Sequence, residues 1–171
     1  MTTMTSISAA DVVRRILAGE RDFASTRIAA ADGDFAAQSD YAEMNRYLAG
    51  LTDLRDNPIL LNGIDWSGVR APGIYLLGAK MAGANFQGAD LRDADLRRSD
   101  LSGANFRGAN VSGSKITNAM FYRSDLRGIV GLDTTRDLGT CQFKHTMVTS
   151  KEKGIIEAAL NARPLFEVRD E

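Results

Sequence analysis

The chain has 171 residues, of which 44% are hydrophobic and 25% are charged, so we expect a soluble globular protein rather than a disordered chain. This length suits one domain, or one repeat array with additional segments. The formal net charge of −1 gives no overall bias toward nucleic acid or an anionic membrane.

The single cysteine and the N-terminal residues indicate a cytoplasmic location. Cys141 has no second cysteine with which to form an internal disulfide, which fits a reducing compartment. Residues 1–13 lack the basic flank and apolar run of a secretory signal. No stretch approaches the ~18 continuous apolar residues of a membrane helix, so we expect no membrane contact.

The N-terminal residues predict a short helix. Ser8 followed by Asp11 is typical of a helix start, because a serine hydroxyl and an acidic third residue cap the first turn. An apolar stripe follows, and Gly19 is a plausible end. Phe23 and Ile28 lie five residues apart, so one or two short strands are expected there.

A second helix is expected over about residues 39–49, with Gly50 as its end. Asn57 and Pro58 then predict a turn. We therefore assign residues 1–58 to an N-terminal helical cap. The sequence leaves open whether these helices only cap the following segment or contact a partner themselves.

A five-residue repeat occupies the middle of the chain. Residues 59–128 form fourteen consecutive units, each with a small or β-branched residue and, two places later, a central residue that is large in all units except that of Ala71. Asp or Asn usually precedes the centre, and glycine often stands two places after it. The centres are Leu61, Trp66, Ala71, Leu76, Met81, Phe86, Leu91, Leu96, Leu101, Phe106, Val111, Ile116, Phe121 and Leu126.

The pattern fits neither a helix nor a plain strand. Residues two apart face the same side of an extended chain, so the small and the large residue of each unit face inward together. Glycine then supplies the positive φ of a tight turn, and Asp or Asn can bond to nearby backbone. Each unit therefore predicts one short side and one corner, and repetition winds a coil that stacks on itself at about 4.8 Å.

The units from Ala84 to Gly113 read ANFQG, ADLRD, ADLRR, SDLSG, ANFRG and ANVSG. They closely resemble the A(D/N)LXX motif of the pentapeptide repeat family. The resemblance implies a mainly β fold, a right-handed quadrilateral β-helix with four units per coil. It implies about 3.5 coils over residues 59–130, with side chains such as Trp66, Phe86 and Phe106 stacked at intervals of twenty. The first units depart from the motif, so distorted coils are expected there.

Residues 131–171 are assigned to a C-terminal cap. Thr149 and Glu152 form a capping-box pattern that predicts one helix over about residues 149–162. The tail that follows either packs back as part of the cap or pairs with a second copy, which leaves a homodimer through the C-terminal region open. The apolar tail residues are Leu165, Phe166 and Val168.

The sequence offers no set of residues typical of catalysis. Cys141 and His145 lie four apart, which is a weak hint of a nucleophile and base, but neither has the further ligands of a zinc site. We expect a buried cysteine in the cap and an exposed loop histidine. The prediction is a protein with no enzymatic activity, no catalytic or metal-binding residues and no cofactor.

Charge bears on the function that the resemblance implies. The resemblance implies a bacterial protein. Some members of the family protect bacterial DNA gyrase by mimicking duplex DNA. A DNA mimic needs negative charge, whereas residues 76–128 carry eight basic and five acidic side chains, a balance of +3. Residues 1–60 carry six basic and nine acidic side chains, a balance of −3. We therefore predict a non-enzymatic interaction or regulatory module, with a DNA mimic that binds gyrase or another type II topoisomerase as the alternative.

The basic side chains of the coil are the candidate contacts for a protein partner. An ordinary solvated surface would also carry arginines, and nucleic acid is a third, disfavoured ligand. Tyr122 takes an outward position beside Arg123, which makes it the best aromatic anchor on the coil. The candidate partner-binding residues are Arg97, Arg98, Arg107, Lys115, Tyr122, Arg123 and Arg127.

Overall fold

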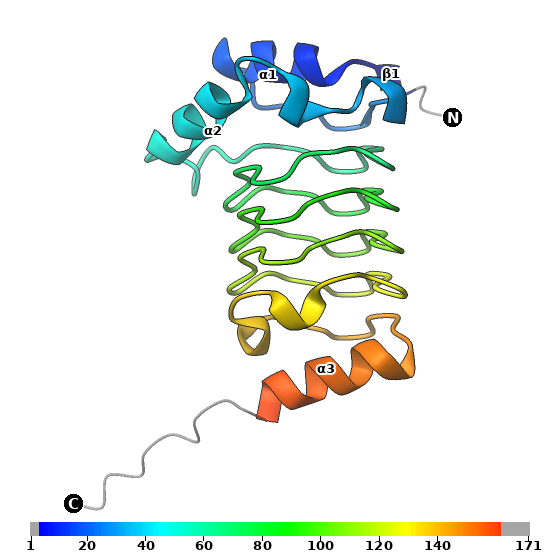
Figure 1. The fold of residues 1–171 in the computed structure, drawn as a ribbon. Coiled ribbons are helices and arrows are strands. Elements are labelled where there is room, and N and C mark those ends of the chain that lie inside the picture. Colours follow the sequence, from blue (N-terminus) through cyan, green and yellow to red (C-terminus); the bar gives the residue numbers. More distant parts are fainter. Residues whose placement is uncertain (1–3, 162–171) are drawn as a thin grey trace, which may run out of the picture.

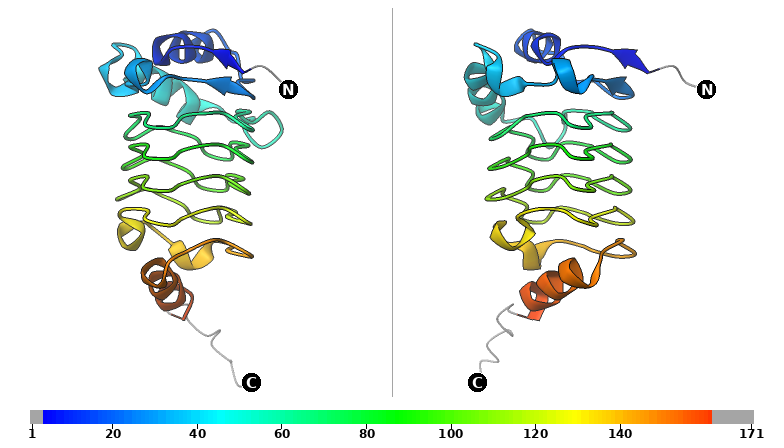
Figure 2. Two further views of the ribbon diagram at one scale, coloured as in Figure 1. Left: turned by 90° about the vertical axis from the view of Figure 1, so that its right-hand side faces the viewer. Right: turned by 45° about the vertical axis from the view of Figure 1, so that its right-hand side comes forward.

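A stack of coils forms the body of the molecule, with helices at both ends (Figure 1). This computed structural model describes residues 4–161. Helices α1 (Ala9–Leu17) and α2 (Tyr41–Gly50) lie at one end, and α3 (Ser150–Asn161) lies at the other (Figure 2). No helix within these residues is both long and apolar enough to cross a membrane.

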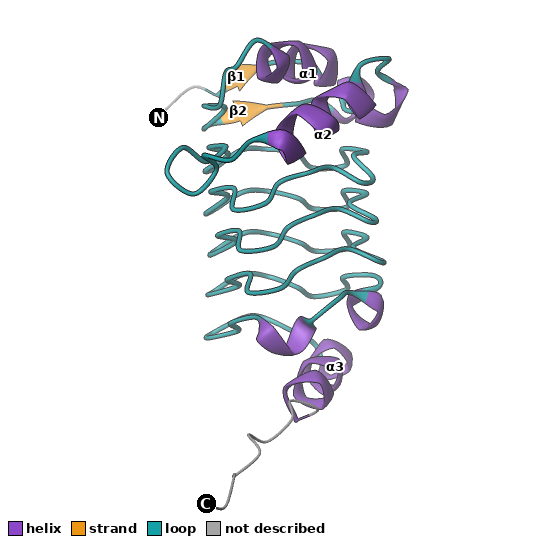
Figure 3. Ribbon diagram, turned by 90° about the vertical axis from the view of Figure 1, so that its left-hand side faces the viewer, coloured by secondary structure: helices purple, strands orange, loops and turns teal. Residues whose placement is uncertain are grey.

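Backbone pairing confirms the predicted coil of four units. Within the repeat, parallel bridges join residues twenty apart, and they fall into four ladders, one for each side of the coil. Figure 3 shows the successive coils stacked between the helical ends. One ladder joins Leu60, Lys80, Asp100 and Met120. Between coils, the Leu61 N–H donates to the carbonyl of Lys80 at 2.7 Å, and the Lys80 N–H donates to the carbonyl of Ile59 at 2.9 Å.

The coil contains less regular strand than the sequence predicts. Within residues 4–161 only β1 (Thr5–Ser6) and β2 (Thr26–Arg27) form strands, and they pair in parallel. Elsewhere each side of a coil makes a single bridge. The reason is the short unit: the N–H of its first residue closes the preceding corner, as Ile64 does to the Leu61 carbonyl at 3.2 Å. Too few residues remain on a side to pair as a ladder of their own.

Glycine occupies most corners because the backbone there has a positive φ, as at Gly68 with φ of 68°. Two of the predicted contact residues take the same corner position without being glycine. Arg98 has φ of 58° and Arg123 has φ of 56°. In this left-handed region of the backbone, the steric energy of a residue with a side chain is higher by about 1–2 kcal/mol. Asp93, with φ of 57°, is a third such corner.

A column of aromatic rings runs along the axis of the coil. Trp66 lies with its ring centre 6.2 Å from that of Phe86, and Phe86 stacks on Phe106 at 5.1 Å. The resemblance to the pentapeptide repeat family implied that these three stack, and they do. All three side chains are essentially inaccessible to solvent. The column continues to Phe35 at the N-terminal end and through Phe121 to Phe143 at the other.

The ladders extend beyond the repeat that the sequence reveals, which was assigned to residues 59–130. On the N-terminal side, Asp22 and Asp34 pair with Leu60 and Arg70. The expected strand character near Phe23 and Ile28 is therefore confirmed, since both are buried between these bridges. On the C-terminal side the ladders continue to Arg136, Gln142 and Met147.

The N-terminal cap begins with the predicted helix. The Asp11 N–H donates to Ser8 Oγ at 3.1 Å, and the Ser8 N–H donates to the Asp11 carboxylate at 3.1 Å, which is a complete capping box. Helix α2 takes the place of one side of a coil. The Tyr75 N–H, which would otherwise meet a preceding rung, donates to Asn45 Oδ1 of α2 at 2.9 Å. A side chain thus closes the open edge.

Side chains close the other edge in the same way. Within the repeat, a corner N–H donates to a carbonyl of the next coil, as Gly63 does to Ala82 at 2.9 Å. In the last coil Thr134 Oγ1 accepts the Gly113 N–H at 3.0 Å, and Glu152 of α3 accepts that of Gly128 at 3.3 Å. The short helices η3 (Leu132–Thr134) and η4 (Leu138–Thr140) lie here. Helix α3 matches the predicted range, whereas the tail proposed for a dimer (Leu165, Phe166 and Val168) lies outside the described residues.

Candidate partner-binding surface

Three arginines of the coil are held by an aspartate two residues earlier. Arg97 donates from Nε and Nη2 to the two carboxylate oxygens of Asp95 at 2.7 and 2.6 Å. Arg92 binds Asp90 and Arg127 binds Asp125 in the same two-point geometry. These contacts raise the pKa of each of the three guanidinium groups. An Asp-X-Arg unit therefore neutralises its own charge.

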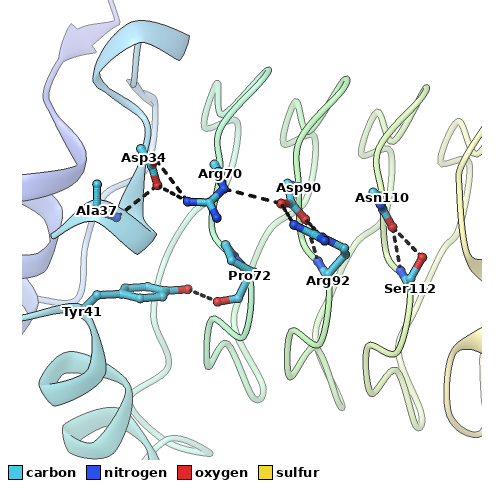
Figure 4. A network of polar contacts seen from close by, with 9 residues as sticks. All are labelled: Asp34, Ala37, Tyr41, Arg70, Pro72, Asp90, Arg92, Asn110 and Ser112. Carbon is cyan, nitrogen blue, oxygen red and sulfur yellow. Dashed lines mark hydrogen bonds and ion pairs between the residues drawn. The ribbon is translucent and has the colours of Figure 1, made fainter.

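Such pairs join into a network on one side of the coil, shown in Figure 4. Arg70 reaches Asp34 of the cap at 3.1 Å, and its Nε lies 4.0 Å from the Asp90 carboxylate, which also holds Arg92 at 2.7 Å. The hydrogen bond from Arg92 is the main cause that lowers the pKa of Asp90. We call this the compensated side, defined by the ladder of Asp34, Arg70, Asp90, Asn110 and Val130.

An asparagine in place of the aspartate leaves the following arginine without a carboxylate. Asn105 Oδ1 accepts the backbone N–H of Arg107 at 3.1 Å, and its amide donates to Asn85 at 3.1 Å. Arg107 is exposed and forms no ion pair with any described residue. Its remaining influence is long-range, since it contributes to lowering the pKa of Asp125.

The side of the coil half a turn from the compensated side gathers exposed cations. We call it the basic side, defined by the ladder of Leu60, Lys80, Asp100, Met120 and Gln142 and by the corners at Arg98 and Arg123. Over residues 4–161, none of its cations lies within ion-pair distance of a carboxylate. Asp100, the carboxylate on the ladder, accepts the Ser102 N–H at 3.0 Å.

A shallow hollow lies where the basic side meets the last coil. It is lined by Tyr122, Arg123, Lys144 and His145, together with Ser102 and Gly103. We call it the C-terminal hollow. Tyr122 is 37% exposed, and its hydroxyl donates to the side chain of Gln142. An aromatic ring beside several cations offers both contact area and charge to a partner.

A second hollow lies at the other end of the basic side. The loop after α2 folds against the first coils, and the hollow between them is lined by Leu51, Leu54, Arg55, Leu77, Lys80 and Arg98, with Thr52 and Gly78. We call it the cap groove. Its lining combines three leucines, Leu51, Leu54 and Leu77, which we call the apolar floor, with three cations. Loop and coil residues that lie more than twenty positions apart thus form one surface.

The seven predicted contact residues fall into two groups: those close to a carboxylate, and those that are not. Arg97 and Arg127 are held by aspartates, and Lys115 Nζ lies 4.0 Å from the Asp95 carboxylate. Arg107 stands on a different side from the two hollows. Arg98 lines the cap groove, whereas Tyr122 and Arg123 line the C-terminal hollow.

Four further residues that line the hollows were not among the predicted contacts: Arg55, Lys80, Lys144 and His145. Lys80 could have been found from the twenty-residue register, which places it beside the predicted corner at Arg98. Lys144 could not, because the last coil pairs at an offset of twenty-two residues, as Met120 does with Gln142. Arg55 carries no such signal, because its loop lies outside the repeat.

Cys141 and His145 differ in their surroundings. The Cys141 thiol is buried and donates to the Ile116 carbonyl at 2.9 Å, as expected for a structural cysteine. His145 is exposed at a corner with φ of 59°. Among the described residues there is no cluster of three or more His, Cys, Asp or Glu that could hold a metal ion.

Comparison with protein families supports the repeat directly. A family model described as pentapeptide repeats matches residues 61–98 and 94–130, with eight copies. The repeat region belongs to the pentapeptide repeat family. A comparison with curated proteins gives no match.

Several solved structures are similar to this chain. A pentapeptide repeat protein from the Arabidopsis thaliana thylakoid lumen shares 26% identity, with 58% of this chain and 68% of that one covered and a TM-score of 0.43. HetL of Nostoc sp. strain PCC 7120, described as involved in the regulation of heterocyst differentiation, shares 28% identity, with 52% and 35% covered and a TM-score of 0.33. QnrB1, a plasmid-mediated fluoroquinolone resistance protein, shares 19% identity, with 60% and 63% covered and a TM-score of 0.27. The chain thus spans less than two thirds of HetL and of QnrB1.

Proposed function

We propose that this pentapeptide repeat protein is a non-enzymatic docking module. In this proposal a right-handed quadrilateral β-helix with helical caps presents its basic side to an acidic protein partner in the cytoplasm. The observation that carries the proposal is the unequal pairing of charge. Arg98, Arg123 and their cationic neighbours have no carboxylate partner among the described residues, whereas the compensated side is paired internally.

Unpaired cations on a rigid surface favour association for a physical reason. Their field is not cancelled by a nearby carboxylate, so it steers an acidic partner toward that surface. The rigid coil adds little ordering cost on binding, because its backbone is already held between neighbouring coils. Both corner arginines also occupy backbone positions where glycine would cost less, which is consistent with retention of their side chains for contact.

The gyrase-directed alternative has weaker support. A DNA mimic needs a continuous run of free negative charge along its surface. On this coil Asp90, Asp95 and Asp125 are each bound by an arginine. We therefore expect no protection and no inhibition of gyrase in a DNA supercoiling assay with the purified protein, and an effect at low micromolar protein would favour the alternative.

Affinity capture from native lysate tests the docking function. The variant Arg98→Glu/Arg123→Glu reverses two charges of the basic side. The control Arg46→Glu/Lys151→Glu makes the same charge change on exposed positions of α2 and α3. We expect wild type and control to retain the same partner and the first variant to retain at least about tenfold less. Equal retention by all three would show that the basic side is not the contact.

A further inference from the structure

We propose that the cap groove binds an extended acidic segment of a protein partner, with one large apolar side chain of that segment seated on the groove floor. This inference rests on the proposed docking function and adds the place and the chemistry of the contact. The groove combines an apolar floor, three cations and a loop that is held in place, and each of these observations contributes one part of the inference.

The apolar floor is unusual for this coil. Leu77 occupies the outward position directly after a unit centre, where the other units of residues 81–128 carry Ala, Gln, Arg, Ser, Thr or Tyr. Leu51 and Leu77 are half-buried and Leu54 is 7% exposed, so part of this apolar surface remains accessible. Apolar surface that remains accessible beside cations suits an apolar side chain of a partner.

The charges around the floor are of one sign. Arg55, Lys80 and Arg98 are all exposed, and none is ion-paired within residues 4–161. The acids of the same loop do not line the groove. Asp53 instead binds Arg21 at 3.1 Å, and that hydrogen bond is the main cause that lowers its pKa. The groove therefore selects acidic residues on both sides of an apolar one.

The loop that forms one wall is fixed to the cap. Arg21, whose side chain is only 14% exposed, donates to the Asn57 carbonyl at 2.7 Å as well as to Asp53. Within the loop the Asn57 N–H donates to the Asp53 carbonyl at 2.8 Å. A wall that is already ordered reduces the entropy lost on binding, so a short segment can bind measurably.

The shape of the surface favours an extended segment over a helix. Lys80 and the corner of Arg98 belong to successive coils, which stack at about the spacing of paired strands. Alternate side chains of an extended chain point to opposite faces, so one apolar residue can face the floor while acidic residues on either side reach the cations of the rim.

Peptide titration monitored by backbone amide NMR tests the inference. Three short synthetic peptides serve as probes: one acidic with a central Phe, the same peptide with Gln in place of Phe, and a basic one that keeps the Phe. We expect the acidic Phe peptide alone to shift the amides of the loop after α2 and those near Leu77 and Arg98, with Kd below about 1 mM. We expect Leu77→Gln and Arg98→Gln each to weaken this binding about tenfold, whereas Met147→Gln, at an exposed apolar site outside the groove, leaves it unchanged.

Several outcomes would overturn the inference. They are equal binding of the Gln peptide, shifts confined to another surface, and no binding at 1 mM by a folded protein. The lysate capture separates this failure from that of the docking function. A partner that wild type and Leu77→Gln retain equally, but that Arg98→Glu/Arg123→Glu loses, would place the contact outside the groove and leave the docking function intact.

Discussion

The compensated side and the basic side are built on the same coil and differ in what surrounds their arginines. On the compensated side, Arg70 and Arg92 lie against Asp34 and Asp90. On the basic side, Arg98 and Arg123 stand at corners with no ion pair in the described part of the chain. One fold thus supports two surfaces, one whose charges stabilise the protein and one whose charges remain available to a partner.

The difference follows from the position of the arginine within the unit. An arginine directly after the centre lies two residues from the position that usually holds Asp, so it folds back onto that carboxylate, as Arg92 does. An arginine one place later takes the corner: in the unit of Arg98 the Asp95 carboxylate is already bound by Arg97, and the unit of Arg123 carries Met120 in place of the aspartate. Corner arginines, as at Arg98 and Arg123, are therefore the better candidates for contact.

The largest effect is expected where the two sides share their core. Phe86→Ala removes a fully buried ring that contacts Trp66 and Phe106. We expect the free energy of unfolding to fall by about 3–5 kcal/mol, because the cavity cannot close between fixed coils. Urea denaturation measures this loss, and hydrogen exchange should show weaker protection on both sides together. Weaker protection on one side alone would mean that the sides are not one cooperative unit.

The next largest effect is expected when the ion pairs of the compensated side are removed. Asp90→Asn removes the carboxylate that holds Arg92 and lies near Arg70. We expect a loss of about 1 kcal/mol in unfolding free energy, small because both arginines are about half exposed. The freed arginines should also raise the affinity for the acidic Phe peptide at a second site. Asp56→Asn, an exposed acid outside these ion pairs, is the control.

Substitutions at the non-glycine corners separate the contribution of a corner side chain to stability from its contribution to binding. Arg98→Gly should stabilise the protein by about 0.5–1 kcal/mol, because glycine adopts φ of 58° without steric cost. The same change should weaken partner binding. Asp93→Gly, at a corner of the compensated side with φ of 57°, should stabilise to a similar degree without affecting binding. Thermal unfolding and capture of the partner measure the two effects, and equal binding by both variants would contradict the proposed role of Arg98.

The smallest effect is a pH dependence. The native pKa of Asp90 is lowered, chiefly by its hydrogen bond from Arg92, so its pairing stabilises the protein fully above the unfolded pKa of about 4. This contribution is lost as the pH falls through the lower native pKa. We expect the difference in unfolding free energy between wild type and Asp90→Asn to shrink by less than about 1 kcal/mol from pH 6 to pH 3. A difference that grew on acidification would assign the effect to another group.

The sequence by itself determined the coil, because its pattern is local. A small residue, a large one and a corner recur within five positions, so the inward position of Trp66, Phe86 and Phe106 follows from the repeat. The resemblance to the pentapeptide repeat family added the four units per coil that stack these rings. Ser8 and Asp11 determine the start of α1 for the same reason, since a capping box needs only four consecutive residues. The pairing of Arg92 with Asp90 is equally local.

Tertiary structure alone decided the ends of the coil and the candidate surfaces. Asn45 replaces a missing rung, and Thr134 replaces a missing carbonyl, although neither belongs to a repeat unit. The cap groove depends on a loop that is held by hydrogen bonds from Arg21, which lies more than thirty residues earlier in the chain. Such contacts are determined by which segments the fold places side by side, and a five-residue pattern contains no information about them.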